Sequence, residues 1–317
     1  MEMTANYSSI TSQPEYDIDF WNLMRNKAVK SNTLSKGMET NTGTYKLPSS
    51  SLKQVSKIID KESVFRKMAT NIGAYKTGYR IYAKDCKDKA QFVAEGEAIP
   101  IYEGIEDFTK YCVESHKLTA IVKLDEDFVN DAAFDIEKYL SEKFGKSFAR
   151  AEDNAFVCGT GNGEPTGILH DTAGADVGVE ASKLTYDDVI SLYFSVASEY
   201  RRNGVWIMND KTALTLRKLK DADGNYLWNS NNDTILGKPV VISEYMPDIE
   251  NGLKPVAFGD FSYYWIIDRK PVSVRTLTEK FAFYDQIGYL AMEFLDAKLV
   301  RSEAIKVIKM SNSNENV

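Results

Sequence analysis

A glycine-rich stretch is the part of the sequence that most resembles a ligand-binding loop. Residues 159–167 read GTGNGEPTG, and glycine-rich loops can cradle phosphate groups with backbone N–H groups. Such loops precede a helix, whose N-terminus carries the partial positive charge that favours a phosphate. Here the glycines follow a long helical pattern, at the end where the helix dipole is negative. The order of the elements therefore argues against nucleotide binding and predicts a helix stop.

Histidine and cysteine, which carry much enzyme chemistry, are scarce. His116 lies in a strand pattern, and His170 lies in a loop with no serine or cysteine nucleophile tied to it by the sequence. The cysteines Cys86, Cys112 and Cys158 form no CxxC pair. No nucleophile elbow, P-loop, HExxH or metal-spaced cluster occurs. We therefore predict no catalytic residue, no cofactor and no metal site.

Composition indicates an acidic globular protein. The 317 residues suffice for roughly one to three domains, and 43% hydrophobic residues can fill a core. The net charge of −7 argues against a protein that coats nucleic acid through a basic surface, but not against one that encloses it. No apolar run approaches the ~18 residues of a membrane helix, and the N-terminus lacks the features of a secretion signal. Reduced thiols fit a cytoplasmic setting.

The longest periodic stretch runs from about residue 133 to 157. Apolar residues recur at steps of three and four, which places one apolar stripe along a helix, and acidic residues crowd its start. About 25 residues at ~1.5 Å each give a rod of roughly 37 Å, which is long for a compact domain. We predict a central, spine-like helix. The stripe consists of Ala133, Ile136, Leu140, Phe144, Phe148, Ala151 and Ala155.

Two segments lack a hydrophobic core of their own. Residues 1–50 are polar, with one short helix candidate at 17–29, and fit an extended arm or a disordered tail. Residues 78–124 read as two strands with a charged, glycine-punctuated connection. They predict a β-hairpin that projects from the body and needs a partner surface, with an ordinary packed hairpin as the alternative. Residues 51–70 read as one amphipathic helix.

The second half of the chain reads as a compact α/β region. Thr185 and Asp188 form a capping-box-like start for a helix that runs to Gly204. The strand VWIMN, a helix over 211–220 and the strands ILGKPVVISEYMP and PVAFGDFSYYWIIDR follow. The tail is predicted to be β-rich, with a short helical segment around 286–294.

Several short motifs occur in order along these elements. The spine helix ends in ARAEDNAFVCGTGNGEPTGIL, and LGKPV and FGD follow further along. Over about residues 40–310 this order closely resembles the major capsid proteins of tailed bacteriophages with the HK97-type fold. The resemblance marks a set of structural motif positions. They are Glu152, Asp153, Phe156, Gly159, Gly161, Gly163, Pro165, Gly167, Gly237, Pro239, Gly259 and Asp260.

The resemblance implies an α+β, wedge-shaped subunit. A peripheral domain would hold the spine helix, and an axial domain would gather around five- and six-fold axes. An E-loop hairpin and an N-terminal arm would lie across neighbouring subunits, preceded by a candidate remnant of a scaffolding region. The expected ranges are 1–27 for that N-terminal segment, 28–54 for the arm, 55–77, 116–160 and 266–295 for the peripheral domain, 78–115 for the E-loop, 160–265 with 296–311 for the axial domain, and 312–317 for a frayed tail.

The function that the resemblance implies is assembly. Copies of the chain would form pentamers and hexamers that close into an icosahedral head around double-stranded DNA. Assembly would take place in the bacterial host cytoplasm, and the finished protein would belong to the virion. Portal, scaffolding, protease and decoration proteins are the other expected partners, without a membrane and without sequence-specific DNA binding. A strongly basic lining would hinder packing and ejection of DNA, so the acidic composition fits.

A covalent crosslink between subunits is not predicted. Some relatives join a lysine to an asparagine, and the hairpin has Lys84, Lys87, Lys89 and Lys110. However, residues 272–295, which should offer the asparagine, contain none.

Two other interpretations stay open at this point. An encapsulin-like shell shares the fold but stores an enzyme cargo, and the long polar arm favours the phage head over it. A cytoplasmic enzyme would use the 159–167 loop as its ligand site, form a small oligomer and gain thermal stability from a ligand.

Overall fold

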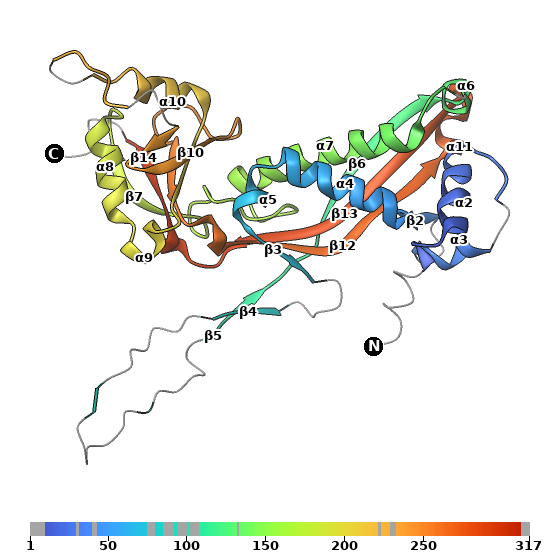
Figure 1. The fold of residues 1–317 in the computed structure, drawn as a ribbon, viewed down its shortest axis with the longest axis horizontal. Helices are drawn as coiled ribbons and strands as arrows, with labels where there is room; N and C mark the ends of the chain where they lie inside the picture. Colours follow the sequence, from blue (N-terminus) through green and yellow to red (C-terminus); the bar gives the residue numbers. More distant parts are fainter. Residues whose placement is uncertain are drawn as a thin grey trace.

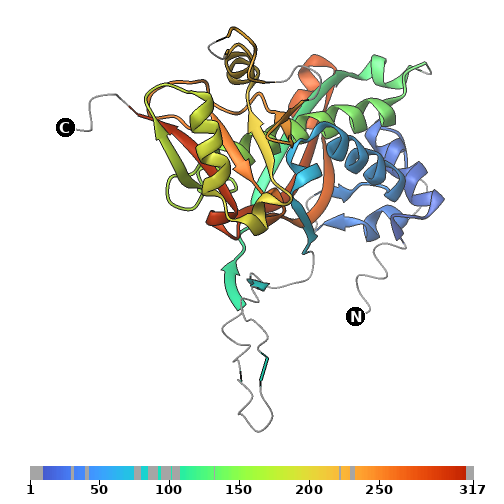
Figure 2. The same cartoon turned by 60° about the vertical axis from the view of Figure 1, so that its left-hand side comes forward.

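The computed structural model describes most of the chain as an elongated molecule with two lobes. One lobe lies at each end, two long strands run between them, and a β-hairpin projects from the middle of one side (Figure 1). A view from another direction shows the same projection (Figure 2). The described residues are 10–29, 32–39, 43–74, 80–84, 92–93, 101, 108–131, 133–220, 223–228 and 233–311.

The first lobe, on the right in Figure 1, is built on a sheet that includes both long strands. Its elements are β1 (Met38–Glu39), β2 (Thr44–Lys46), β3 (Thr70–Gly73), β6 (His116–Asp125), β12 (Tyr264–Leu277) and β13 (Gln286–Leu299). The order is β1-β2-β12-β13-β6, all antiparallel, and β3 runs parallel to the start of β12. Short helices close its far end, namely α6 (Glu126–Asn130), α11 (Thr278–Phe281) and the 3-10 turn η2 (Ala282–Tyr284).

The predicted spine helix is confirmed as α7 (Ile136–Cys158), which lies along this sheet. It begins later than the expected residue 133 because Asp135 caps it, accepting a hydrogen bond from Lys138 N at 3.1 Å. The predicted stripe points into the core, where Ile136, Leu140, Phe144 and Phe148 are buried.

The helix expected over 51–70 is interrupted. The structure has α4 (Ser49–Glu62), then a break, then α5 (Phe65–Met68). Ser63 is extended, with ψ of 132°, and its side chain turns to the spine helix instead of continuing α4. α4 runs parallel to α7 and packs closely, since a Cβ on Gly145 would lie 2.8 Å from Ile58.

The N-terminal region differs from the expected extended arm. α2 (Pro14–Met24) and α3 (Thr33–Lys36) pack on the first lobe, and β2 joins its sheet. Tyr16, Phe20 and Met24 are fully buried in the core. The sequence interpretation began the helix at residue 17 and so missed the stripe of positions four residues apart that starts at Tyr16.

The second lobe is a compact α/β unit with its own sheet. The sheet order is β7-β14-β11-β8-β10-β9, with β7 and β14 parallel and β8 and β10 parallel. Its strands are β7 (Asp176–Ala181), β8 (Val205–Met208), β9 (Thr234–Ile235), β10 (Lys238–Ile242), β11 (Val256–Gly259) and β14 (Ile305–Met310). Its helices are α8 (Tyr186–Ser195), α9 (Ser198–Arg201), α10 (Asp210–Arg217), η1 (Phe261–Tyr263) and η3 (Ser302–Ala304).

The helix α8 begins as predicted but ends earlier than predicted. The capping box is confirmed, because Thr185 Oγ1 accepts from Asp188 N while Asp188 accepts from Thr185 N. The helix does not run to Gly204, because Val196 and Ala197 are extended and separate α8 from α9.

The helical segment expected at 286–294 is wrong. These residues form β13, which pairs with β12 on one edge and with β6 on the other. β13 continues to Leu299 in the first sheet. The chain therefore re-enters the second lobe after residue 299 and not at the expected residue 296. β14 then completes the second sheet between β7 and β11.

The predicted hairpin is described at its base. β4 (Arg80–Lys84) pairs with β5 (Phe108–Cys112) in a separate two-stranded sheet. Most of the expected E-loop beyond these strands lies outside the described residues. Ala74 and Val113, which flank the hairpin, pack against Ile267 of β12.

Candidate functional site

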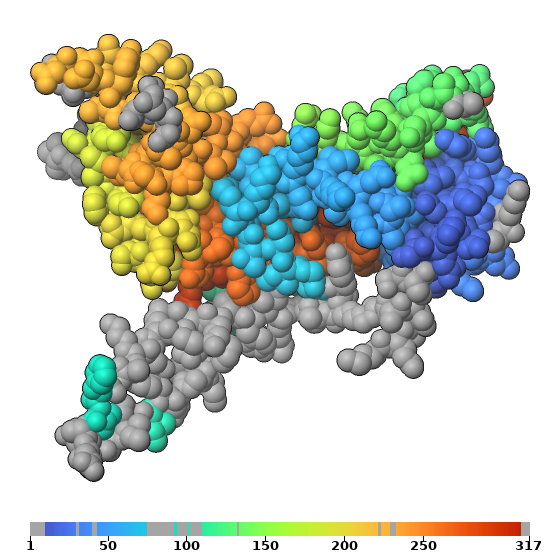
Figure 3. Space-filling model, in the orientation of Figure 1, coloured from blue at the N-terminus to red at the C-terminus, as the bar shows by residue number. Residues whose placement is uncertain are grey.

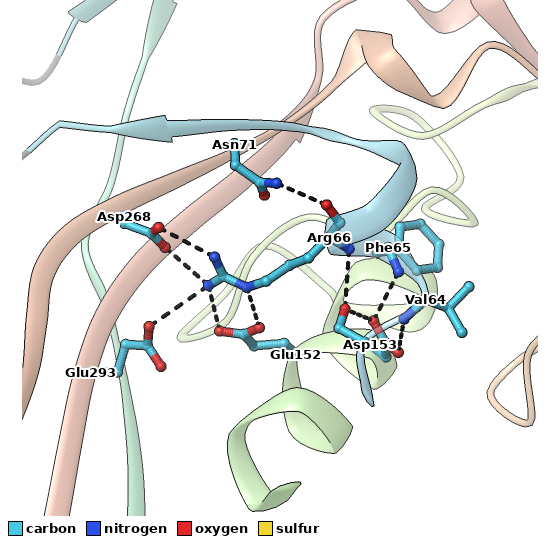
Figure 4. A network of polar contacts seen from close by, with 9 residues as sticks. Val64, Phe65, Arg66, Asn71, Glu152, Asp153, Asp268 and Glu293 are labelled. Atoms are coloured by element: carbon cyan, nitrogen blue, oxygen red, sulfur yellow. Dashed lines mark hydrogen bonds and ion pairs between the residues drawn. The ribbon is translucent and has the colours of Figure 1, made fainter. Parts of the chain in front are cut away.

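A buried ion network joins the C-terminal end of α7 to the rest of the first lobe (Figure 4). Arg66, on α5, forms two hydrogen bonds with Glu152 of α7, both at 2.7 Å. It forms two more with Asp268 of β12, at 3.0 and 3.2 Å. Glu293 of β13 lies 3.7 Å from the same guanidinium group. One cation therefore ties three elements that are distant in sequence to a single point.

The charges in this network do not balance, because three carboxyl groups face one guanidinium. Glu152 and Glu293 are almost completely buried, and Glu293 Oε2 has no hydrogen-bond partner among the described residues. Burial, together with the neighbouring carboxylate of Glu152, raises the pKa of Glu293 well above its usual range. Burial alone would lower the pKa of Arg66, but Glu152 and Asp268 raise it well above its ordinary value. Burial also raises the pKa of Glu152, which Arg66 opposes, so the network favours a charged Arg66 and disfavours ionisation of Glu293.

Asp153, the next residue of α7, holds the start of α5. Its carboxylate accepts hydrogen bonds from Ser63 Oγ at 2.6 Å, Val64 N at 2.8 Å and Phe65 N at 3.2 Å. These backbone N–H groups have no partner within α5, so the aspartate supplies the missing acceptors. Burial raises the pKa of Asp153, and these hydrogen bonds oppose that shift. Glu152 and Asp153 thus fix α5 to α7 from two sides.

An aromatic cluster lies directly beside these ionic contacts. The rings of Phe65 and Phe156 are 6.0 Å apart, and Tyr264 lies 5.8 and 5.7 Å from them. Phe261, from the second lobe's η1, meets Phe65 edge to face at 6.0 Å. This apolar core spans the junction of the two lobes.

The glycine-rich loop after α7 closes the C-terminal end of the helix. Ile168 N donates to Phe156 O at 2.8 Å, and Leu169 N donates to Val157 O at 3.0 Å. These bonds satisfy carbonyl groups that a helix end otherwise leaves open. Gly167 has no room for a side chain, since a Cβ there would lie 2.5 Å from Val157 O. Gly159 is equally confined, by backbone atoms of Ala155 and Pro165.

The N–H groups of this loop are mostly occupied by acceptors of the protein itself. Thr160 N donates to the Glu164 carboxylate, Thr166 N to Ala297 O, and Gly167 N to Gly159 O. Gly161 and Gly163 have φ values of 75° and 77°, which favour glycine. The loop is therefore a folded helix cap, and its described contacts do not support a phosphate cradle.

The remaining motif positions lie in the second lobe. Gly259 approaches Ala304 O too closely for a Cβ, and Asp260 accepts from Ser262 N at 3.0 Å to begin η1. Both lie within two residues of Phe261 and so beside the lobe junction. Gly237, with φ of 73°, forms with Leu236 the two-residue turn between β9 and β10.

The structure brings together some of the predicted positions and not others. Those from Glu152 to Gly167 form one junction. Pro239 is exposed on β10, next to the turn at Gly237, and lies in the second lobe, away from this junction. Sequence reasoning missed Arg66, Asp268 and Glu293. For Glu293 a signal existed, because it is the single charged residue in the apolar run IGYLAMEFL.

The hairpin base is held by a second polar cluster. Buried Asp296 of β13 accepts a hydrogen bond from Glu114 N at 2.7 Å. Lys298 Nζ donates to Cys112 O at 2.9 Å, and Tyr111 OH donates to Val300 O. These contacts set the direction in which the hairpin leaves the body, but they reach only its base.

The histidines occupy structural positions. His116 Nε2 lies 3.5 Å from Asp296, beside the hairpin base. His170 Nδ1 faces the backbone N–H groups of Thr172 and Ala173, at 3.3 and 3.1 Å, so it acts as an acceptor in a turn. Among the described residues no group of His, Cys, Asp and Glu is arranged to hold a metal ion. No helix in the described ranges is long and apolar enough to cross a membrane.

Comparison with known proteins adds to this geometry. The model of the phage capsid family matches residues 43–310. A capsid polyprotein of Pseudomonas phage PAJU2 is 24% identical over 197 residues, which are 59% of this chain but 29% of that polyprotein. The chain thus spans less than a third of the length of that relative.

Solved structures of capsids share the fold. The capsids of the empty and the native GTA particle are both 28% identical, with TM-scores of 0.64 and 0.65, over 79% of this chain and 90% of theirs. A structure from Gordonia phage Cozz is 14% identical, with a TM-score of 0.55, over 79% of this chain and 87% of that one.

Proposed function

This chain belongs to the phage capsid family, and on that premise we propose that it builds an icosahedral phage head as pentamers and hexamers around double-stranded DNA. Its fold is the α+β, HK97-type capsid fold, and its role is structural. The matched family favours the phage head over an encapsulin-like shell and over an enzyme.

The observation that carries the proposal is the unsupported hairpin. β4 and β5 pair with each other, and the described chain offers them no further strand. An isolated two-stranded ribbon is at best marginally stable in water. Phe92 and Ile101, two described positions beyond the strands, are fully or almost fully exposed. Such apolar side chains gain by burial against another copy of the chain.

We assign the parts of the subunit accordingly. The first lobe, with α7, is the peripheral domain, and the second lobe, with β14, is the axial domain around the five- and six-fold axes. The hairpin is the E-loop that crosses a neighbouring subunit. Portal, scaffolding, protease and decoration proteins are further partners of the assembled head, which forms in the host cytoplasm and becomes part of the virion.

The subunits are held by non-covalent contacts in this proposal, because residues 272–295 offer no asparagine for a crosslink to a hairpin lysine. Heterologous contacts of this kind close into rings and shells without any bond formation. Particles boiled in SDS should therefore give a single band near 35.7 kDa. A ladder of multiples would show crosslinking and refute this part.

Negative-stain electron microscopy with sedimentation tests the main proposal. Purified protein should form closed particles or rings of five and six subunits. Particles recovered from cells should hold DNA, whereas a co-purified enzyme cargo would indicate the encapsulin-like alternative. A small uniform oligomer that never assembles in crowding agents or salt would contradict the proposal.

A further inference from the structure

One surface of the first lobe is basic although the whole chain has a net charge of −7. We call the exposed side of α4, α5 and α7 the helical face; in Figure 3, α4 and α7 form adjoining parts of this surface. It exposes eight cations and three carboxylates. The cations are Lys53, Lys57, Lys61, Lys67, Lys138, Lys143, Lys146 and Arg150, and the carboxylates are Asp60, Glu62 and Glu142.

The cations of the helical face form no ion pair with any other described residue. None of the eight has a carboxylate within 4.0 Å in the described part of the chain. Some cations elsewhere are paired, as Lys211 is with Asp248 at 2.5 Å and Lys254 with Asp171 at 2.9 Å. The positive charge of this face is therefore available to an external anion.

The hairpin leaves from the opposite side of the sheet. Ile266 of β12 packs with Phe156 of α7, so it points to the helices. The next residue, Ile267, packs with Ala74 and Val113 at the hairpin base. Successive residues of a strand point to opposite faces. In a shell whose copies all present the same side outward, the hairpins and the helical face consequently lie on different surfaces.

The hairpin is one acidic part of the chain, besides residues 125–137, which lead into α7, and it could neutralise a cationic surface of a neighbour. Its segment 94–107, AEGEAIPIYEGIED, has five acidic residues and no basic one. A neighbour's hairpin would neutralise the side of the sheet that faces away from the helices. That side exposes Lys117, Lys123, Lys270 and Arg275. The helical face, on the other side, gains nothing from it.

We propose that the helical face is the inner wall of the head and that its cations contact the phosphates of the packaged DNA. This inference rests on the proposed function. Lys53, Lys57 and Lys61 follow each other at about 6 Å along the axis of α4. Contacts of this kind read charge and not sequence, and salt weakens them strongly. Such a wall can hold DNA loosely and still release it.

The helical face suits DNA better than an acidic protein. Stable protein interfaces have a core of apolar and aromatic side chains. The large hydrophobic residues that are well exposed on this protein include none from α4, α5 or α7, all of whose residues the structure describes. A phosphate backbone needs no apolar anchor, since release of counterions supplies most of the affinity.

The test measures binding of a fluorescent, mixed-sequence DNA duplex to the full-length protein as free capsomers, over a series of salt concentrations. The charge-reversal variant Lys61→Glu/Lys146→Glu/Arg150→Glu is compared with Lys183→Glu/Arg202→Glu/Lys218→Glu, which makes the same change in net charge on the second lobe. We expect at least tenfold weaker binding for the first variant at about 50 mM salt, and less than threefold for the second. The salt slope should flatten by roughly 0.9 for each lost contact, about 2.7 in all.

Equal losses in the two variants, or no binding by the natural sequence at low salt, would overturn the proposal. So would preferential binding of poly-glutamate, added as a second probe, because it would indicate an acidic protein as the partner. Circular dichroism checks that both variants fold. Electron microscopy of the same samples distinguishes failure of this inference from failure of the proposed function. Natural protein that forms shells but does not bind DNA refutes only this inference, whereas natural protein that forms no shells refutes the proposed function.

Discussion

The C-terminal end of α7 and the projecting hairpin use their polar groups in opposite ways. At the end of α7, Arg66, Glu152 and Asp153 all form hydrogen bonds within the subunit. In the hairpin, β4 and β5 bond to each other, and the described contacts that hold them to the body come from its base, at Tyr111 and Glu114. In our proposal the first region stabilises one subunit, and the second contacts the neighbouring subunits. Stability and assembly should therefore respond to different substitutions.

We expect the largest loss of stability when the cation of the ion network is removed. Arg66→Ala leaves the buried carboxyl groups of Glu152, Asp268 and Glu293 without their common partner. Loss of one member of a buried ion pair costs about 3–5 kcal/mol, so we expect a loss of that size in the free energy of unfolding. Urea denaturation of free capsomers, followed by circular dichroism, measures it.

Arg150→Ala is the matched control, because Arg150 is exposed on the neighbouring helix α7. It should change stability by about 0.5 kcal/mol or less. Equal effects of the two substitutions would mean that the network contributes little, and the contrast between the two regions would fail.

The second prediction concerns the glycine-rich loop. Gly167→Ala places a methyl group 2.5 Å from two backbone atoms, Gly159 N and Val157 O, which cannot move aside as a side chain can. We expect a loss of about 1–3 kcal/mol, from overpacking and from a weakened cap on α7. The melting temperature of free capsomers should fall, and a variant as stable as the natural protein would show that the loop is not a tight cap.

The third and smallest effect is the pH dependence of stability. Because burial and Glu152 raise the pKa of Glu293, the folded protein binds this proton more tightly than the unfolded chain does. Glu293 therefore makes stability fall as the pH rises from the ordinary glutamate pKa towards the raised one. Glu293→Gln cannot ionise, so it should match the natural protein at about pH 4 and below and exceed it increasingly up to pH 8, by on the order of 1 kcal/mol or more.

Thermal melts across this pH range measure the difference, with exposed Glu142→Gln as the control that should leave the profile unchanged. The stability of Glu293→Gln should still fall somewhat with rising pH, since burial also raises the pKa of Glu152 and Asp153. Parallel profiles for Glu293→Gln and the natural sequence would show that Glu293 ionises freely.

Local patterns in the sequence predicted the spine helix, the capping box at Thr185 and the hairpin strands. They did so because periodicity and capping are properties of neighbouring residues. They failed where tertiary contacts decide. Ile287, Leu290, Ala291 and Phe294 have helical spacing, yet pairing with two neighbouring strands makes this segment a strand.

The candidate site was predicted only in part for the same reason. Glu152, Asp153 and the loop glycines were found through a family resemblance. Arg66 and Asp268, which are 202 positions apart, carry no local signal of their contact. The net charge likewise concealed the basic helical face, because it averages over acidic segments elsewhere.

The most direct test of the central claim replaces residues 85–107 by Asn-Gly. Lys84 and Phe108 are register partners, so a two-residue turn of this type can close the shortened hairpin. We predict a subunit with natural circular dichroism and an almost unchanged melting temperature in free capsomers, but no closed particles in sedimentation and electron microscopy. Closed shells from this variant, or an unfolded subunit, would contradict the division between a region that holds the fold and a region that joins the copies.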